Sequence, residues 1–143
     1  MLKRIPNEIS PELMHTLMSM GHGDEIVLAD GNFPAASNAN LLVRADGHDV
    51  CTLLKAIMQF FPLDTFVDDY AVVMQVVDPD ADEPPIWHEF RNILNNAEDW
   101  NVELTAIERY DFYERAREAF CVVATSEKAL YANLILKKGV VQE

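Results

Sequence analysis

The chain has 143 residues, half of them hydrophobic, with 24 acidic and 11 basic residues. This length suits one domain spanning residues 1 to 143, and the composition indicates a packed globular protein. The formal net charge of −13 repels nucleic-acid phosphates and anionic membrane surfaces, so we expect neither as a partner.

Export and membrane insertion are not predicted either. The first eight residues contain no apolar signal-peptide core, and no later apolar run reaches membrane-spanning length. Cys51 and Cys121 belong to no Cys-x-x-Cys pattern, which favours buried, reduced thiols over a disulfide or a metal site. We therefore expect a cytoplasmic protein.

Helices and apolar strands are predicted to alternate along the chain. Ser10 provides an N-cap for a first helix that ends at Gly21, and residues 26–29 are apolar at every position, as in a strand covered on both faces. Asp111 and Glu114 form a capping-box pattern. The other expected elements, in chain order, are a helix from about Asp49 to Phe61, a strand over 71–77, a surface loop over 78–85, a helix carrying Trp87 and Phe90, a strand around Val102 and Leu104, a helix from Phe112 to about Ala119, and strands over 120–124 and 134–136.

This alternation predicts an α/β domain with a mostly parallel central sheet and helices on both faces. In open α/β sheets, ligands bind where loops gather at the ends of the strands. Several polar residues stand at such predicted boundaries, namely His22, Asp30, Arg109 and Tyr131.

His22 and Asp30 stand at the two ends of the predicted strand over 26–29. An unperturbed imidazole titrates near pH ~6.5 and is suited to repeated proton transfer. Asp30 can accept hydrogen bonds from sugar hydroxyls, or it can form an Asx turn before Gly31. If the loops at both ends of the strand curl toward one cleft, His22 and Asp30 can bridge a ligand the size of a sugar. The alternative is an ordinary glycine-terminated helix followed by a strand.

Familiar cofactor and nucleophile motifs are missing. The sequence contains no Walker A loop, no G-x-G-x-x-G and no G-x-S-x-G. His88 and Glu89 begin like a zinc-protease helix but lack the second histidine, so we expect both on a solvated helix face. We predict neither a cofactor nor a metal.

Three segments together resemble a known family. They are Met20 to Glu25 with Asp30, Arg109 to Ala116, and Tyr131 to Gly139. These segments are similar to the bacterial sugar mutarotases of the L-fucose mutarotase and D-ribose pyranase family, over about Leu2 to Gly139. The resemblance implies a D-ribose pyranase-like fold and a cofactor-free exchange of sugar anomers. L-fucose is the expected substrate, with D-ribose or D-galactose as alternatives.

The resemblance also implies roles for particular residues. His22 would be the general acid at the ring oxygen, and Asp64 either a second catalytic group or only a loop cap. Members of this family form rings of subunits, typically decamers, with sites near subunit contacts. The resemblance therefore implies a homo-oligomer. The residues implied to bind the sugar are Asp30, Met74, Arg109, Tyr113, Tyr131, Ala132 through its backbone, and Asn133.

Other interpretations remain open at this point. Without the family resemblance, Arg109 is interpreted as a surface arginine. The alternative for Tyr113 is a core tyrosine on its helix. A monosaccharide-binding module without turnover would need Asp30, Arg109 and Asn133 but not His22. A metal-dependent aldose–ketose isomerase would need clustered histidine and carboxylate ligands, a spacing that the sequence lacks.

Overall fold

The predicted apolar strands lie side by side in one six-stranded sheet, in the order β2-β5-β1-β6-β3-β4. A computed structural model describes residues 1 to 143. Its elements are α1 (Pro11–Ser19), β1 (Glu25–Ala29), α2 (Ala35–Asn38), β2 (Leu42–Ala45), α3 (Val50–Ile57), β3 (Ala71–Met74), α4 (Pro85–Ala97), β4 (Thr105–Ile107), α5 (Arg109–Glu118), β5 (Cys121–Thr125) and β6 (Leu134–Lys137).

The sheet is mixed, since β6 runs antiparallel to both of its neighbours, β1 and β3. The pairs β1–β5, β2–β5 and β3–β4 are parallel. A parallel crossover needs a dozen or more residues, whereas β5 and β6 are joined by residues 126–133 alone. This short connection passes the end of β1 and sends β6 back in the opposite direction.

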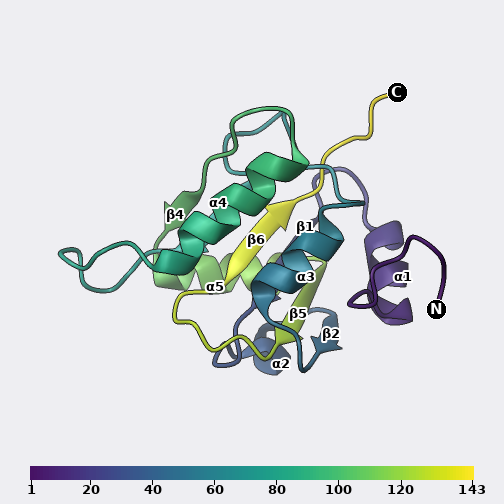
Figure 1. The fold of residues 1–143 in the computed structure, drawn as a ribbon. Coiled ribbons are helices and arrows are strands. Elements are labelled where there is room, and N and C mark those ends of the chain that lie inside the picture. The colour runs from purple at the N-terminus through teal and green to yellow at the C-terminus, as the bar shows by residue number, and fades with distance from the viewer.

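Helices cover both faces of the sheet, as the sequence predicts (Figure 1). The larger core lies between the sheet and α1, α3 and α4, and the smaller core lies between the opposite face and α2 and α5. Side chains of β1 alternate between the two: Ile26 and Leu28 belong to the larger core, Val27 and Ala29 to the smaller. Burial on both faces explains why β1 is apolar at every position from Ile26 to Ala29.

Side chains cap the first two long helices, at Ser10 as the sequence predicts and at Asp49, where the sequence predicts only that a helix begins. The Ser10 hydroxyl accepts a hydrogen bond from the Leu13 amide at 3.0 Å, and the Asp49 carboxylate accepts one from the Thr52 amide at 2.7 Å. Both interactions satisfy amides that have no partner within the helix. The helix after Asp49 is shorter than expected and ends at Ile57, after which turns lead to Phe61.

The prediction for the start of α5 is wrong by one turn. Its N-cap is Glu108, whose carboxylate accepts hydrogen bonds from the Tyr110 and Asp111 amides at 2.8 and 3.2 Å. Asp111 therefore lies inside the helix. Arg109 becomes its first residue, at the junction between β4 and α5.

Three strands also differ from expectation. The strand predicted around Val102 starts only at Thr105, because the Val102 and Glu103 amides are bonded to the side chains of Asn95 and Tyr70. The strand that begins at Ala71 ends at Met74. The edge strand β2 and the one-turn helix α2 are additions that the sequence patterns did not predict. The acidic loop before α4 projects from the body of the molecule (Figure 1).

Candidate functional site

Polar side chains gather at both ends of the β1–β6 pair. Because the two strands are antiparallel, Asn133, just before β6, lies beside Asp30, just after β1. At the other end, Lys138, just after β6, lies beside Gly23 and Asp24, just before β1. The predicted site residues divide between these two ends.

Asp30 and Asn133 form a double contact at one end. The Asp30 amide donates to Asn133 Oδ1 at 2.8 Å, and Asn133 Nδ2 donates to Asp30 Oδ2 at 3.0 Å. Both residues are buried, with exposed fractions of 6% and 5%. Asp30 Oδ1 also accepts the amides of Asn32 and Phe33, each at 2.9 Å, so the predicted Asx turn is present. Asp30 Oδ2 accepts only one of these bonds and keeps acceptor capacity for a ligand.

Tyr131 has an unusual backbone conformation, with φ at +57°. Non-glycine residues rarely adopt this conformation, and it persists only where neighbouring contacts hold it. Here the Tyr131 carbonyl accepts the Trp87 indole N–H at 3.0 Å, and the Tyr131 hydroxyl accepts the Val77 amide at 3.2 Å. Trp87 therefore supports this turn, a role that its place in a predicted helix did not indicate. Ala132 is fully buried behind this turn.

A hollow of about 240 Å³ opens above Asp30. It contains six of the nine predicted site residues. Its lining residues are Asp30, Asn32, Phe33, Met74, Val77, Arg109, Tyr113, Leu130, Tyr131 and Asn133. Carboxylate, guanidinium, phenol and amide groups here face an apolar wall, a combination that suits a small polyol.

Arg109 and Tyr113 form the α5 side of the hollow. The Arg109 guanidinium lies over the Tyr113 ring, 5.5 Å from its centroid, in cation–π geometry. Interaction with the Tyr113 side chain raises the pKa of Arg109, so the guanidinium is charged at every working pH. The Tyr113 ring packs in turn against Phe33, with centroids 5.5 Å apart. Arg109 is exposed and has no carboxylate partner within ion-pair distance.

His22 and Asp64 form a pair at the opposite end of β1. His22 Nε2 lies 3.2 Å from Asp64 Oδ1, and the two side chains are 48% and 3% exposed. The loop that carries His22 is held by the Gly21 amide, which donates to Asp24 Oδ2, and by the Gly23 amide, which donates to the Lys138 carbonyl. The imidazole thus faces solvent while its carboxylate partner is buried.

The Asp64 segment is packed against the chain that follows β6. The Asp64 amide donates to the Lys137 carbonyl at 3.1 Å, and the Gly139 amide donates to the Pro62 carbonyl at 2.8 Å. A Cβ atom at Gly139 would stand 2.4 Å from the Leu63 carbonyl oxygen. Only glycine permits this close approach of the two backbones.

The structure does not bring His22 and Asp30 into one cleft within a chain. The four steps of β1 from Glu25 to Ala29 span about 13 Å, and the two residues lie beyond opposite ends of that strand. The condition for a bridging ligand, that loops at both ends of the strand curl toward one cleft, is therefore not met within a single chain. One chain has a sugar-sized hollow at one end and an imidazole–carboxylate pair at the other.

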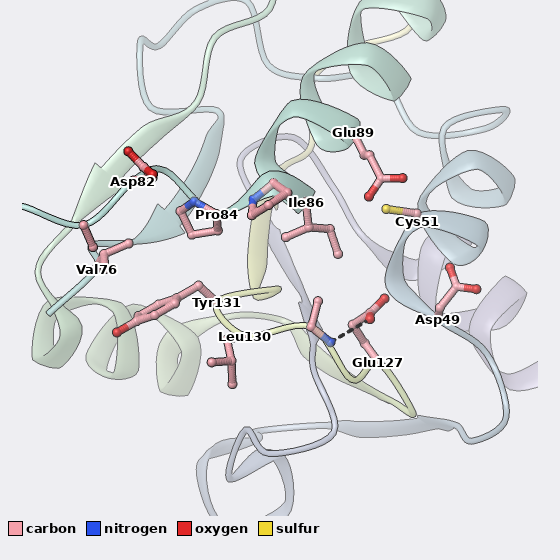
Figure 2. A pocket seen from close by; sticks show the side chains of 13 residues that line it. Asp49, Cys51, Val76, Asp82, Pro84, Ile86, Glu89, Glu127, Leu130 and Tyr131 are labelled. Carbon is pink, nitrogen blue, oxygen red and sulfur yellow. Dashed lines mark hydrogen bonds between the residues drawn. The ribbon is translucent and has the colours of Figure 1, made fainter. Parts of the chain in front are cut away.

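A larger hollow, of about 700 Å³, lies next to the first and shares Leu130 and Tyr131 with it. Figure 2 shows Asp49, Cys51 and Glu89 along one side and Tyr131 with Val76 along the other. Desolvation and the charges of Glu89, Glu127 and Asp49 raise the pKa of the Cys51 thiol to about 12. This thiol is therefore protonated at neutral pH. Of the predicted site residues, only Tyr131 lines this hollow.

Similarity to known proteins covers nearly the whole chain. Residues 3–141 match the RbsD / FucU transport protein family. The chain belongs to this family. The fucose mutarotase of Mus musculus is 50% identical over 144 residues, which cover 96% of this chain and 94% of that protein. The L-fucose mutarotase of Haemophilus influenzae (strain 86-028NP) is 46% identical over 140 residues, covering 98% and 97%.

Solved structures of the RbsD / FucU family share this architecture. The fucose mutarotase from Streptococcus pneumoniae, crystallised in complex with L-fucose, is 49% identical and superposes with a TM-score of 0.92 over 99% of this chain and 100% of its own. Bacillus subtilis RbsD, complexed with D-ribose, shares the fold at 20% identity, with a TM-score of 0.72 over 99% of this chain and all of its own. These likenesses confirm the predicted D-ribose pyranase-like α/β fold.

Three further observations concern metal sites, membrane-spanning helices and the cysteines. No group of three or more histidine, cysteine, aspartate or glutamate side chains is arranged to hold a metal ion. No helix combines the length and the apolar character needed to cross a bilayer. Cys121 is buried and Cys51 half-buried, and both are free.

Proposed function

We propose that this protein interconverts the α and β anomers of L-fucose by acid/base-assisted opening and closing of the sugar ring, without a cofactor. Similarity to fucose mutarotases at 46 to 50% identity over nearly the full length supports this activity. The observation that carries the proposal is the hollow above Asp30, where the predicted sugar-binding side chains meet. A neutral polyol suits this protein, because its net charge of −13 repels anionic substrates.

In this proposal, the hollow binds and orients the sugar. Asp30 accepts hydrogen bonds from ring hydroxyls, and Asn133 holds its carboxylate in place through the double contact. The planar guanidinium group of Arg109 donates hydrogen bonds to sugar oxygens. Met74 provides part of the apolar wall. Tyr113 keeps Arg109 over the hollow through the cation–π contact.

His22 supplies the proton in this mechanism. Ring opening requires a proton on the ring oxygen and loss of the proton from the anomeric hydroxyl, and closure on the other face of the carbonyl reverses both transfers. The exposed imidazole donates its proton to the ring oxygen on opening and recovers one on closure, while solvent water accepts and then returns the proton of the anomeric hydroxyl. The buried Asp64 carboxylate orients the ring and stabilises its cationic form.

We propose that the His22–Asp64 pair of one copy acts on sugar held in the hollow of another copy. The separation of the two half-sites along β1 supports this arrangement. Exposed apolar side chains at both ends also support it: Phe66 lies beside His22, and Val77 and Leu130 border the hollow. A contact between two different surfaces is heterologous and, when repeated, can close a ring. A decamer is the assembly that we expect, and its mass can be checked by light scattering.

Saturation-transfer NMR on L-fucose tests the activity. The protein should speed exchange between the α and β signals without added metal or nucleotide and without forming fuculose. D-ribose and D-galactose, measured in parallel, establish the sugar preference. Sugar binding without faster exchange would instead support a non-catalytic binding module.

Complementation between two inactive variants tests the shared site. His22→Gln retains an intact hollow, and Asp30→Ala retains an intact imidazole. In assemblies co-expressed from equal amounts, about a quarter of the contacts would combine the intact halves if neighbours share sites. We expect recovery of a corresponding share of wild-type exchange. If each site lies within one chain, the mixture will be as inactive as its components.

We also propose a cytoplasmic location, which the free thiols of Cys51 and Cys121 support. Fractionation of the source cells, with a known cytoplasmic enzyme as marker, tests it.

A further inference from the structure

Phe66 is an exposed aromatic residue attached to the His22–Asp64 pair. Its side chain is largely open to solvent, with 69% of the residue exposed. Its ring centroid lies 5.5 Å from that of His22, with the planes inclined at 54°. The Phe66 amide donates to Asp64 Oδ1 at 3.0 Å, the same oxygen that contacts His22 Nε2.

These contacts link the three residues to one another through Asp64 Oδ1. Asp64 is buried and anchored to the chain after β6, so it fixes the imidazole through its side chain and the Phe66 backbone through the same oxygen. Any ligand that the exposed edge of His22 reaches therefore also lies close to the exposed face of Phe66. A phenyl ring offers that ligand apolar contact and no hydrogen bond.

The chemistry of a pyranose determines which part of the sugar Phe66 faces. The ring oxygen is bonded to two carbons: C1, which carries the anomeric hydroxyl, and C5, which in L-fucose carries a methyl group. The anomeric hydroxyl must exchange a proton and needs a polar neighbour. The C5 methyl needs none. An apolar ring beside the group that protonates the ring oxygen therefore matches the C5 side.

We propose that Phe66 binds the C5 methyl group of the substrate and makes the enzyme selective for 6-deoxy sugars. This proposal rests on the proposed anomer exchange with His22 as proton donor at the ring oxygen. Because burying a methyl group changes kcat/KM by about tenfold or more, the contribution of Phe66 should be visible as a ratio between matched sugars.

Three sugars with the same configuration at C2, C3 and C4 provide the test. L-fucose has a methyl group on C5, L-galactose a hydroxymethyl group, and D-arabinose only hydrogen. We would measure kcat/KM for anomer exchange of each sugar by the wild type, Phe66→Ala and Phe66→Leu. Leu41→Ala, at an exposed apolar residue beside β2, is the matched control.

The wild type should favour L-fucose over D-arabinose by at least about tenfold. Phe66→Ala should lower kcat/KM for L-fucose by about that factor and change kcat/KM for D-arabinose by less than about threefold. It should also raise the ratio of kcat/KM for L-galactose to kcat/KM for L-fucose. Phe66→Leu should retain most of the preference for L-fucose, and Leu41→Ala should retain all of it.

Equal losses of kcat/KM on all three sugars would mean that Phe66 only positions His22, and no change would mean that Phe66 does not touch the sugar. Either result overturns the selectivity proposal while leaving the proposed function intact. A wild type that exchanges no sugar overturns both.

Discussion

Asn133 is bonded to Asp30 twice, through its carbonyl oxygen to the Asp30 amide and through its amide group to the Asp30 carboxylate. The two residues stand 103 positions apart in the chain. This reciprocal contact joins the end of β1 to the start of β6 and aims the Asp30 carboxylate at the hollow. Asn133 therefore orients the group that we propose binds the sugar.

Asn133→Asp should disrupt this contact. An aspartate at this position cannot donate to Asp30 Oδ2 and places two carboxylates together in a buried site. We expect a loss of about 2 to 3 kcal/mol in the free energy of unfolding at neutral pH and a large loss of L-fucose affinity. Urea unfolding and sugar titration measure these effects. Asn40→Asp, an exposed replacement of the same kind, should change neither; a stable Asn133→Asp protein with unchanged affinity would contradict this role.

His22→Gln should lower the exchange rate by about two to four orders of magnitude, the usual contribution of a positioned acid or base. Sugar affinity should remain close to that of the wild type. Exchange NMR and titration calorimetry on the same samples separate these two effects. Exchange at the wild-type rate would exclude the imidazole and make Asp64 the next proton-transfer group to test.

The effect of Asp64→Asn on the exchange rate should depend on the presence of His22. The amide retains the shape of the carboxylate but loses its charge, so it orients and stabilises the imidazole less well. We expect a smaller loss of exchange than for His22→Gln, and little further loss when both are replaced, since residues that act as a unit are not additive. Independent, multiplying losses in the double variant would instead show that Asp64 performs chemistry of its own.

Gly139→Ala should displace the Leu63–Asp64 segment. The added methyl group would meet backbone atoms 2.4 to 2.8 Å away, which cannot move as a flexible side chain does. We expect a loss of about 1 to 3 kcal/mol in stability, together with reduced exchange as Asp64 moves. Thermal and urea unfolding measure the first effect. Gly21→Ala, whose nearest neighbour would be the Asp24 carboxylate at 3.7 Å, should cost far less; equal losses for the two variants would argue against a steric cause.

Asp69 should contribute to stability in a pH-dependent way. Desolvation raises the pKa of Asp69, but the Arg115 charge and hydrogen bond outweigh it and hold the pKa below its ordinary value. Arg115 also binds Glu25 through Nε and Nη2. A lowered folded-state pKa means that the contribution is fully present above the unfolded pKa of about 3.9 and is lost as the pH falls through the folded value.

Asp69→Asn tests this dependence. Because the Asp69 side chain is 45% exposed, solvent screens the ion pair and the loss at pH 7 should stay below about 1 kcal/mol. The difference between variant and wild type should shrink as the pH falls below about 4. Urea unfolding at several pH values checks it. A difference that does not change with pH would assign the effect to packing.

Local features of the sequence predicted much of the secondary structure. Ser10 and Asp49 cap their helices because a cap needs only a side chain and an amide a few residues away. The strand over 26–29 is recognisable because burial on both faces requires apolar residues throughout. β2 was missed because it is a short edge strand whose side chains are not all buried, and the start of α5 was misplaced because both Glu108 and Asp111 can serve as caps.

The sequence by itself determined which residues we propose for the chemistry, since an imidazole before a strand, a carboxylate after it and the family resemblance can all be recognised without the fold. Only the tertiary structure decided which of them meet. The short connection between β5 and β6 makes β6 antiparallel to β1, which pairs Asn133 with Asp30 and carries the Gly139 segment and Asp64 to the opposite end. Strand direction depends on contacts between distant residues. No local pattern could therefore show that His22 lies at the opposite end of β1 from the hollow of the same chain.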